Sequence, residues 1–488
     1  MQKFTYRQVG TLNEPDDFSD YMQQINVNIL FDRDLRHGKN SPLGQPYRLD
    51  QDTEIGNRFC VLPLEGSDGT ADGRPTEVTF RRWERFGTSG AKLIWGGEAV
   101  AVNPSGRTNP RQLMINRETT EDIARLREAV LQRHMESFGH TDDMLVGLQL
   151  SHAGRFSRPE AVDHFKPVLI QNHPDLDDLV KVGPDWPILT DDQIQDIEQD
   201  FIRAARFAED AGFDFVDIRH SSGTLGHEFL SAWGRPGPFG GSIENRTRFL
   251  REIVEGIHAQ TGRLKIGIRL SLFDLPPFTA DPDTGVGIPI SIKHHHGAMF
   301  GGSRDNPVLF DLDEPLRFLE MVEQMGIRMV NLTAGSPYYN THLSCPAYYP
   351  PMGSYKPPQD PLFEVARQIE AVARVKQQIP GLLVVGSGYS YLQEWLPHVA
   401  QYNVSRGLTD FVGLGRALLS YPDMPADILS GARLDRQRIC RTFSDCITAP
   451  ECGLVSGCYP LDRYYMRHPD GKLLRNNKRE HRRTVRSG

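Results

Sequence analysis

Short runs of apolar residues alternate along the chain with longer segments in which apolar residues recur every three or four positions. Eight such runs occur, at 58–63, 92–95, 145–150, 213–218, 265–270, 327–332, 382–385 and 410–414. Runs of this length are typical of β-strands, and the period between them is that of amphipathic helices. Eight parallel strands that alternate with helices predict an α/β fold, a (β/α)8 TIM barrel.

The clearest helix signal lies before the fourth of these runs. Thr190 and Gln193 have the spacing of a capping box, in which each side chain binds a backbone N–H group of the first turn. Ile194 and Phe201 then lie on one apolar face, and Gly212 ends the predicted helix. A strand follows immediately, as the barrel repeat requires.

Three segments do not follow the repeat: an N-terminal arm at 1–51, a loop at 273–312 within the barrel region 52–425, and a C-terminal extension at 426–488. Functional loops lie at the C-terminal ends of barrel strands, so the long loop is expected to cap an active site. The extension contains a cysteine-rich segment and a basic tail. Seven Lys and Arg residues among the last nineteen predict a disordered, solvated end.

Composition narrows the class of protein. The 488 residues carry 55 Lys and Arg against 63 Asp and Glu, a formal charge of −8, which argues against nucleic acid or a membrane as a partner. No apolar run reaches the roughly 18 residues that span a bilayer, and residues 1–20 lack the apolar stretch of a signal peptide. We therefore expect a cytoplasmic protein with a small-molecule substrate; a homo-oligomer is left open.

Glycine-rich strand ends provide a candidate phosphate site. Gly386 and Gly388 follow the seventh strand, and Gly415 and Arg416 follow the eighth. Glycine lets backbone N–H groups approach phosphate oxygens, and barrels commonly bind phosphate with these two loops. Neither loop has the G-x-G-x-x-G spacing of a dinucleotide fold. Turn formation alone is an alternative explanation for these glycines.

Two further strand ends match a flavin. The pyrimidine edge of a flavin offers a carbonyl beside an N–H group, and the amide of Gln149 can bind both. A reduced anionic flavin needs a fixed cation, which Arg269 can supply. The structural alternatives are a Gln149 side chain bonded to backbone and an Arg269 side chain in a buried ion pair.

Several motifs, in this order, resemble the FMN-dependent NADH:flavin oxidoreductase family, the old yellow enzyme group, over about 57–425. The motifs are NRFCVLP at 57–63, QLSHAGR at 149–155, FGGSIENR at 239–246, IGIRLS at 266–271 and DFVGLGR at 410–416. The resemblance implies hydride transfer from NAD(P)H to FMN and then to a substrate. It also implies FMN contacts from Pro63, Leu64, Ala99, Gln149, Arg269, Gly386, Gly388, Gly415 and Arg416.

The chain departs from the family where substrate binds. Ordinary members read I-H-x-A-(H/N)-G-Y-L, whereas residues 218–225 read IRHSSGTL, so the two carbonyl-binding donors become Arg219 and Ser222. The tyrosine proton donor becomes Thr224, whose hydroxyl is far less acidic than a phenol. Because a guanidinium binds oxyanions, we expect a substrate with an anionic or polar group rather than a plain enone.

Four residues are candidates for catalysis. Arg219 and Glu65, which follows the first strand, are predicted to form a polar substrate site; an ion pair with only a structural role is the alternative. Tyr338 and Tyr339, after the sixth strand, are candidate proton donors. His220 should point away from Arg219, because side chains alternate along a strand, and is expected to be a packed or a surface histidine and not an acid. Arg155, Arg219, Arg269 and Arg416 are expected to gather on one face.

The six cysteines are too few for a disulfide framework. Four of them are spaced by five residues each, at Cys440, Cys446, Cys452 and Cys458. Relatives that fuse this barrel to a second flavin domain bind a 4Fe–4S cluster after the eighth strand with C-x2-C pairs. Such pairs are missing here, so we predict no metal site and favour free thiols or a partial structural site, with a cluster left open. Adjacent histidines at 294–296 diverge too much for a metal site.

Together these observations favour an FMN-dependent NAD(P)H oxidoreductase. One alternative is an FMN dehydrogenase of the amine-oxidising type that passes electrons to a separate carrier. A second alternative is a barrel that binds a ligand without redox turnover.

Overall fold

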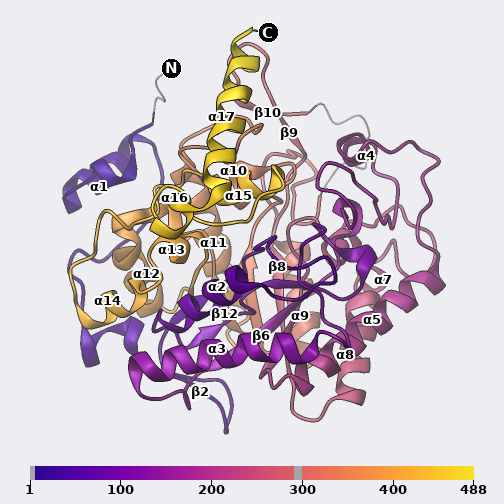
Figure 1. Ribbon diagram of the computed structural model, residues 1–488, viewed down its shortest axis with the longest axis horizontal. Helices are drawn as coiled ribbons and strands as arrows, with labels where there is room; N and C mark the ends of the chain where they lie inside the picture. The colour runs from indigo at the N-terminus through magenta and orange to yellow at the C-terminus, as the bar shows by residue number, and fades with distance from the viewer. Residues whose placement is uncertain (1–5, 291–298, 488) are drawn as a thin grey trace.

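Eight parallel strands close into a barrel in the computed structural model, which describes residues 6–290 and 299–487 (Figure 1). In barrel order the strands are β3 (Phe59–Val61), β4 (Leu93–Ile94), β6 (Leu145–Ser151), β7 (Phe215–Ile218), β8 (Lys265–Ser271), β11 (Met329–Thr333), β12 (Leu383–Gly386) and β13 (Phe411–Leu414). Each strand pairs in parallel with the next, and β13 pairs with β3 to close the ring. The predicted fold and the eight predicted strands are confirmed.

The second barrel strand is split in two, which the sequence did not predict. β4 ends at Ile94, and the chain resumes as β5 (Ala99–Ala101), which pairs with the upper half of β6 and places Ala99 opposite Gln149. Between the halves, Gly96 and Gly97 have φ values of 126° and 54°. A Cβ atom on Gly96 would lie 2.6 Å from the backbone nitrogen of Gln149, so only glycine fits there.

Helices surround the barrel and bury its outer face. The longer ones are α2 (Glu77–Gly87), α3 (Thr120–Phe138), α5 (Asp191–Asp210), α8 (Arg248–Gln260), α9 (Asp313–Gln324), α11 (Pro361–Gln378) and α12 (Leu396–Ser405). Helix α5 begins as predicted, with Thr190 as its N-cap and a capping box to Gln193. Shorter helices are α4 (Pro174–Val180), α6 (Leu225–Leu230), α7 (Ile243–Arg246), α10 (Thr341–Ser344), α13 (Arg416–Ser420), η4 (Pro104–Gly106), η5 (Gly154–Phe156) and η6 (Tyr389–Trp395).

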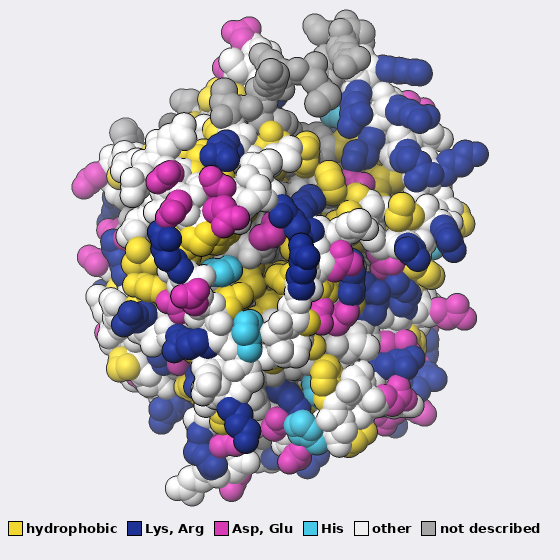
Figure 2. Space-filling view, turned by 90° about the vertical axis from the view of Figure 1, so that its left-hand side faces the viewer, with side chains coloured by type: hydrophobic (Ala, Val, Ile, Leu, Met, Phe, Trp, Pro, Cys, Tyr) yellow, Lys and Arg dark blue, Asp and Glu magenta, His cyan; other side chains and the backbone are white. Residues whose placement is uncertain are grey.

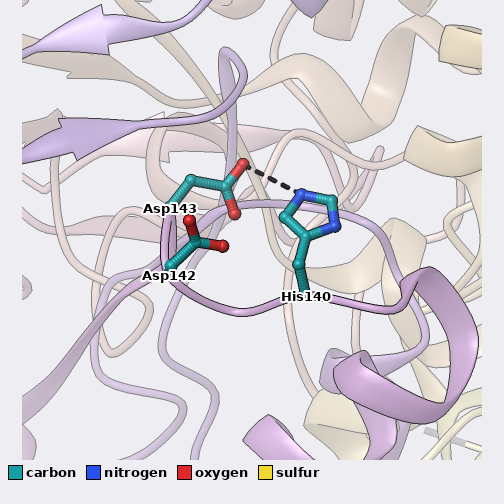
Figure 3. A group of neighbouring side chains, drawn as sticks. All are labelled: His140, Asp142 and Asp143. Carbon is teal, nitrogen blue, oxygen red and sulfur yellow. Dashed lines mark ion pairs between the residues drawn. The ribbon is translucent and has the colours of Figure 1, made fainter.

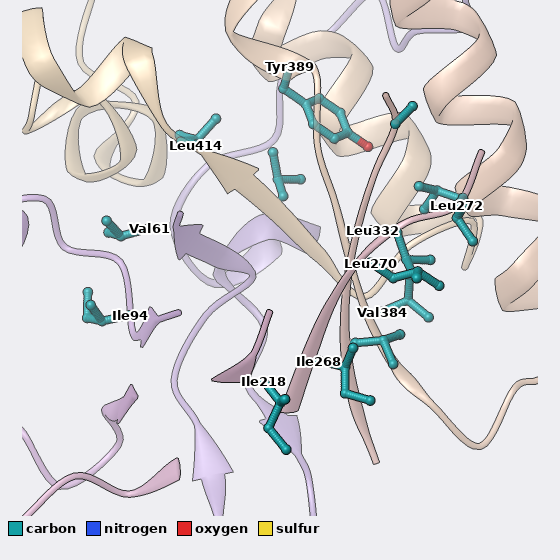
Figure 4. Close-up of a cluster of buried hydrophobic side chains, with 14 of the residues drawn as sticks. Val61, Ile94, Ile218, Ile268, Leu270, Leu272, Leu332, Val384, Tyr389 and Leu414 are labelled. Carbon is teal, nitrogen blue, oxygen red and sulfur yellow. The ribbon is translucent and has the colours of Figure 1, made fainter. Parts of the chain in front are cut away.

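Both faces of the strands are buried, which explains the continuous apolar runs in the sequence. Side chains such as Ile94, Ile268 and Val384 point outward into the layer between strands and helices (Figure 4). A separate apolar cluster that includes Trp95 and Phe215 fills the barrel interior. Alternate residues of one strand therefore serve two different cores.

The N-terminal arm packs against the outside of the barrel and against the end at which the barrel strands begin. It contains η1 (Val9–Thr11), α1 (Pro15–Gln24), η2 (Gly38–Asn40), η3 (Pro42–Gly44) and a hairpin of β1 (Tyr47–Arg48) and β2 (Glu54–Ile55). The ring of Phe18 stacks on that of Trp395, with 4.7 Å between centroids. Ile55 is buried in the same apolar cluster as the barrel interior, so the hairpin closes that end.

The C-terminal extension is helical where a disordered tail was predicted. It contains α14 (Met424–Ser430), α15 (Asp445–Glu451), α16 (Arg463–Arg467) and α17 (Pro469–Ser487). The prediction of a disordered tail was wrong because it used only the number of charged residues and did not consider tertiary contacts. Leu474 packs in an apolar cluster with Tyr459 and Tyr465, and Lys478 pairs with Asp445. In Figure 2, Lys and Arg side chains gather at the upper edge, at the height of α17 in Figure 1.

The loop at 273–312 contains a short antiparallel hairpin of β9 (Phe278–Ala280) and β10 (Gly287–Pro289). The histidines at 294–296 lie outside the described residues. Among the residues that are described, we find no helix with the length and apolar character needed to cross a bilayer.

Candidate active site

A cavity opens at the C-terminal ends of the barrel strands. The predicted site residues that line it are Pro63, Leu64, Glu65, Ala99, Gln149, Arg219, Arg269, Tyr338, Gly388, Gly415 and Arg416. Tyr339 and Gly386 are not among its lining residues. Residues at or after all eight barrel strands thus meet at one place, which follows from the shared direction of parallel strands.

Gln149 is held in one orientation by a buried carboxylate that the sequence analysis did not single out. Its Nε2 atom donates to Asp217 Oδ2 at 2.5 Å, and Trp95 Nε1 donates to the same oxygen at 2.9 Å. The backbone nitrogen of Arg269 donates to Asp217 Oδ1 at 2.6 Å. Since a carboxylate accepts only, the amide oxygen of Gln149 is left for a ligand.

Arg269 lies at the same end of the cavity as Gln149 and is half-buried. Its Nε atom has no hydrogen-bond partner among the described residues. Burial and the nearby charge of Arg219 lower the pKa of Arg269 to about 10, and the charge of Asp217 opposes that shift. The guanidinium therefore stays charged at neutral pH and has a donor to offer to an anion.

A second set of unpaired donors lies beside the glycine-rich loops. Ser387 Oγ and Arg416 Nη1 are buried without a partner among the described residues, while Arg416 Nη2 donates to the carbonyl of Pro346 at 2.8 Å. Gly388 has a φ of 89°, which favours glycine. Buried unpaired donors are costly unless a ligand satisfies them, and their chemistry fits a phosphate.

Glu65 and Arg219 form the ion pair that the sequence suggested. Arg219 Nη1 lies 2.5 Å from Glu65 Oε1, and Thr108 donates to the other oxygen of the carboxylate at 3.0 Å. The Nε atom of Arg219 is buried without a described partner. Ser222, with a φ of 65°, lines the cavity beside them.

The loop that carries Glu65 is anchored by a buried ion cluster. Arg82 on α2 pairs with Glu98, at 2.5 Å, and with Asp68. Glu98 in turn accepts from the backbone nitrogen of Gly66 at 2.9 Å. Glu98 lies between β4 and β5, the two halves of the second barrel strand. The cluster therefore connects this strand to the loop that follows β3 and carries Glu65.

The tyrosines and histidines have different environments. Tyr338 stacks on Phe156, with 4.2 Å between ring centroids, and faces the cavity. Tyr339 points away from it and donates its hydroxyl to Asp274 at 2.5 Å. His220 is buried on the outer face of the strands, with Nδ1 3.1 Å from the carbonyl oxygen of Ile218. Of the two environments predicted for His220, packed or surface, the structure shows the packed one.

Arg155 does not join the other three arginines, although the sequence suggested that all four share one face. It lies in the turn η5 and forms buried ion pairs with Asp177 and Glu228. This turn directs its side chain towards α4 and α6 instead of the cavity. The prediction was wrong because strand order does not specify where a side chain in a following turn will point.

One wall of the cavity comes from the C-terminal extension, which sequence reasoning had not placed there. Its lining residues include Cys446, Ile447, Pro450, Glu451 and Ser456, whereas no described residue of the loop at 273–312 lines the cavity. The extension is fixed to the barrel because the backbone nitrogen of Ser456 donates to the carbonyl of Gly66 at 2.8 Å. No local pattern in the sequence indicates this contact.

Three of the four cysteines in the extension, Cys440, Cys446 and Cys458, lie close enough to influence one another's charge. Among the described residues, no three of the four bring their sulfur atoms within 4.8 Å of one another. The group that does meet this distance is His140, Asp142 and Asp143 (Figure 3). Asp143 already pairs with Lys92 at 2.5 Å, and the group precedes β6, at the barrel end opposite the cavity. We interpret it as a surface ion-pair group.

Comparison with known proteins agrees with this geometry. Residues 42–281 match the model of the NADH:flavin oxidoreductase / NADH oxidase family. The NADPH dehydrogenase of Bacillus velezensis is 33% identical over 213 residues, which are 42% of this chain and 57% of that protein. The chain therefore spans less than two thirds of the length of this relative.

Two solved structures share the fold. A complex of 2-naphthoyl-CoA reductase with 2-naphthoyl-CoA has a TM-score of 0.63 and 17% sequence identity. The aligned region covers 89% of this chain and 58% of the reductase chain. Histamine dehydrogenase from Rhizobium sp. 4-9 has a TM-score of 0.59 and 21% sequence identity. The aligned region covers 86% of this chain and 52% of the dehydrogenase chain. Over the matched region 42–281, about half of its length, the chain is similar to the NADH:flavin oxidoreductase / NADH oxidase family, and it shares the barrel of these solved structures.

Proposed function

We propose that the protein is an FMN-dependent NAD(P)H oxidoreductase whose small organic substrate carries an anionic or polar group. The observation that carries the proposal is a cavity at the mouth of the barrel with buried donors that have no hydrogen-bond partner within residues 6–290 and 299–487, namely Arg269 Nε, Ser387 Oγ and Arg416 Nη1. Such donors are expensive to bury unpaired, so they indicate an anionic ligand.

FMN is the ligand that fits these donors. Its phosphate would lie against Gly388, Gly415 and Arg416, and its pyrimidine edge against Gln149 and Arg269. Pro63, Leu64 and Ala99 would line its ring. A bound FMN would supply hydride transfer between a nicotinamide and the substrate.

Arg219 is the residue that we assign to the substrate. Glu65 engages one of its nitrogens, which leaves the rest of the guanidinium to bind a carbonyl or carboxylate oxygen. Because Glu65 neutralises part of the positive charge, the pair can accept a polar group as well as an anion. Tyr338 faces the same space and would contact the substrate.

Two measurements test this assignment. FMN should be released when the purified protein is denatured, and it should be identified by its mass. Arg219→Ala should lower the turnover of an anionic substrate by about 10- to 100-fold, since a hydrogen bond to a charged group contributes roughly 1.5–3 kcal/mol. Turnover and ligand binding that stay unchanged in Arg219→Ala would refute the active-site role of this arginine.

A further inference from the structure

Two polar side chains that the proposed function does not use, Asn109 and Arg158, line the cavity near Arg219. Asn109 lies in the loop after β5, and Arg158 follows η5 after β6. The Nε atom of Arg158 donates to the carbonyl of Thr108 at 3.2 Å, which joins the two loops. The hydroxyl of Thr108 donates to Glu65, the ion-pair partner of Arg219. Asn109 and Arg158 therefore lie beside the pair that we assign to the substrate.

The amide of Asn109 is held in one orientation and has a donor left over. The residue is only 6% exposed, and its Oδ1 atom accepts from the backbone nitrogen of Arg111 at 2.9 Å. Its Nδ2 atom makes no hydrogen bond with any residue that the structure describes, and the side chain lines the cavity. A donor on a buried side chain is costly unless an acceptor satisfies it, so Asn109 indicates a ligand with an acceptor atom.

The guanidinium of Arg158 is fixed in place, but its charge is not neutralised by an ion pair. Its Nη1 atom donates to the carbonyl of Val162 at 3.0 Å, and the group lies 5.1 Å from the ring centroid of Phe165 and 6.0 Å from that of Tyr338. Within residues 6–290 and 299–487 it forms no ion pair, although its charge acts on the exposed Glu451. The Nη2 atom is left for the oxygen of a carboxylate or a phosphate.

Arg158 and Arg219 act on the same part of the cavity. Burial and the charge of Glu65 raise the pKa of Tyr338 to about 12, and the positive charges of Arg158 and Arg219 oppose that shift. The hydroxyl of Tyr338 is therefore within electrostatic reach of both guanidinium groups, and all three side chains line the cavity. Glu65 neutralises part of the charge of Arg219, whereas Arg158 has no such partner among the described residues. The two arginines can thus take different groups.

We propose that Asn109 and Arg158 form a second anion subsite beside Arg219, which binds a carboxylate or phosphate group. The inference rests on the proposed function, which places the reacting part of the substrate at Arg219. Two ligands of such an enzyme have this chemistry, namely a substrate with a second carboxylate and the nicotinamide cofactor with its phosphates. Because backbone contacts already fix both donors, little conformational freedom is lost when the anion binds.

Dissociation constants measured by titration calorimetry on the oxidised holoenzyme test the subsite without turnover. The probes are succinate, glutarate and adipate, each compared with the monocarboxylate of the same chain length. At least one dicarboxylate should bind about tenfold or more tightly than its monocarboxylate, as a charge-assisted hydrogen bond predicts. In Arg158→Gln this preference should disappear, while the affinity for the monocarboxylate stays within about twofold of the wild type.

Nicotinamide mononucleotide and nicotinamide riboside, which differ by one phosphate, test the cofactor as the source of the anion. A preference for the mononucleotide that Arg158→Gln removes would assign the subsite to the cofactor. A loss of the dicarboxylate preference alone would assign the subsite to the substrate. Both results support an anion subsite at Arg158.

Asn109→Asp is a second, nearly isosteric probe. Its carboxylate can still accept from the backbone nitrogen of Arg111, but a negative oxygen replaces the Nδ2 donor, so the preferred dianion should bind at least about tenfold more weakly. Arg111→Gln is the matched control, because it removes a neighbouring exposed charge that does not line the cavity. An equal loss in Arg111→Gln and Arg158→Gln would show a long-range effect of charge and contradict the subsite.

The outcomes separate the two claims. If the wild-type protein holds FMN and shows neither preference, the subsite is refuted while the proposed function stands. The same holds if Arg158→Gln and Asn109→Asp retain FMN, which shows that they fold, and keep the wild-type preferences. A purified wild-type protein without FMN contradicts the proposed function, whatever the affinities for the carboxylates are.

Discussion

The end of the cavity that would hold the flavin and the end that would hold the substrate are built from different parts of the chain. The flavin end consists of strand ends and the turns that follow them, such as Gln149, Arg269 and Gly388. The substrate end combines the strand ends at Glu65 and Arg219 with a helix from the C-terminal extension. The first set is positioned by barrel register, whereas the second depends on a contact between distant segments.

This difference shows which features follow from the barrel fold alone. Parallel strands end at the same face of the barrel, so the fold by itself brings the predicted cofactor-binding residues together. The substrate wall can be replaced without changing the barrel, because it rests on a few contacts such as the hydrogen bond from Ser456 to Gly66. We therefore expect substitutions at the two ends to act on different measurements.

The largest effect, on the free energy of unfolding, is expected at the buried ion cluster of Arg82, Asp68 and Glu98, which anchors the loop that carries Glu65. Arg82→Ala leaves the buried carboxylates of Asp68 and Glu98 without their cation, and breaking a buried ion pair costs about 3–5 kcal/mol. Urea unfolding should report this loss of stability. Arg133→Ala, which removes exposed ion pairs with Glu136 and Glu84, should cost less than about 1 kcal/mol. Equal losses in the two variants would show that the buried cluster is not an anchor.

The next effect should be confined to the flavin end. Arg416→Ala removes a cation beside the predicted phosphate position, so the dissociation constant of FMN should rise by about 10- to 100-fold. Titration of the apoprotein with FMN, followed by flavin fluorescence, measures it. Arg406→Ala, an exposed residue after α12, is the control and should bind FMN as the wild type does. Unchanged affinity in Arg416→Ala would contradict the phosphate assignment.

A smaller effect is expected from the carboxylate behind Gln149. Asp217→Asn lets the amide of Gln149 turn over, and FMN affinity should fall by about tenfold, the value of one hydrogen bond of roughly 1 kcal/mol or slightly more. The same titration measures it. An affinity within twofold of the wild type would mean that Asp217 does not orient the amide.

Asp217 also predicts a pH dependence. Burial raises its pKa from 3.8 to about 6, so between these values the folded state binds more protons than the unfolded chain. The free energy of unfolding should therefore fall as the pH rises from about 4 to about 6, and this component should be missing in Asp217→Asn. Urea unfolding of both proteins at several pH values gives the difference; parallel curves would contradict the raised pKa.

The smallest effect is expected at Tyr338. Tyr338→Phe keeps the ring that stacks on Phe156 and removes only a hydroxyl whose pKa burial raises to about 12. Turnover of a small anionic substrate should slow by less than about threefold. A loss of about 100-fold or more would instead make the Tyr338 hydroxyl a proton donor.

The barrel was predictable because its signal is local and repeated. Each strand lies in an apolar run of four to six residues, and each strand end carries its candidate residue with it, as for Gln149 and Arg269. The split of the second strand was missed because Gly96 and Gly97 interrupt the run. The helical state of α17 was missed because its charges dominate the composition while Leu474 anchors it.

Side chains whose position depends on tertiary contacts could not be predicted in this way. Tyr338 and Tyr339 are adjacent in the sequence, yet only Tyr338 faces the cavity, because Asp274 binds the hydroxyl of Tyr339. Arg155 follows the same strand as Gln149 but pairs with Glu228. Glu451 carries no motif at all, and its place in the cavity depends on how the extension packs.

The central claim is that this barrel binds FMN and reduces it with a nicotinamide, and an anaerobic absorption spectrum of the purified protein tests it most directly. The account predicts flavin bands that bleach when NADH or NADPH is added. A protein without flavin bands would contradict it and would indicate a barrel that binds ligands without redox turnover. Flavin bands that resist both nicotinamides and bleach only with an amine would equally contradict it, in favour of a dehydrogenase that passes electrons to a separate carrier.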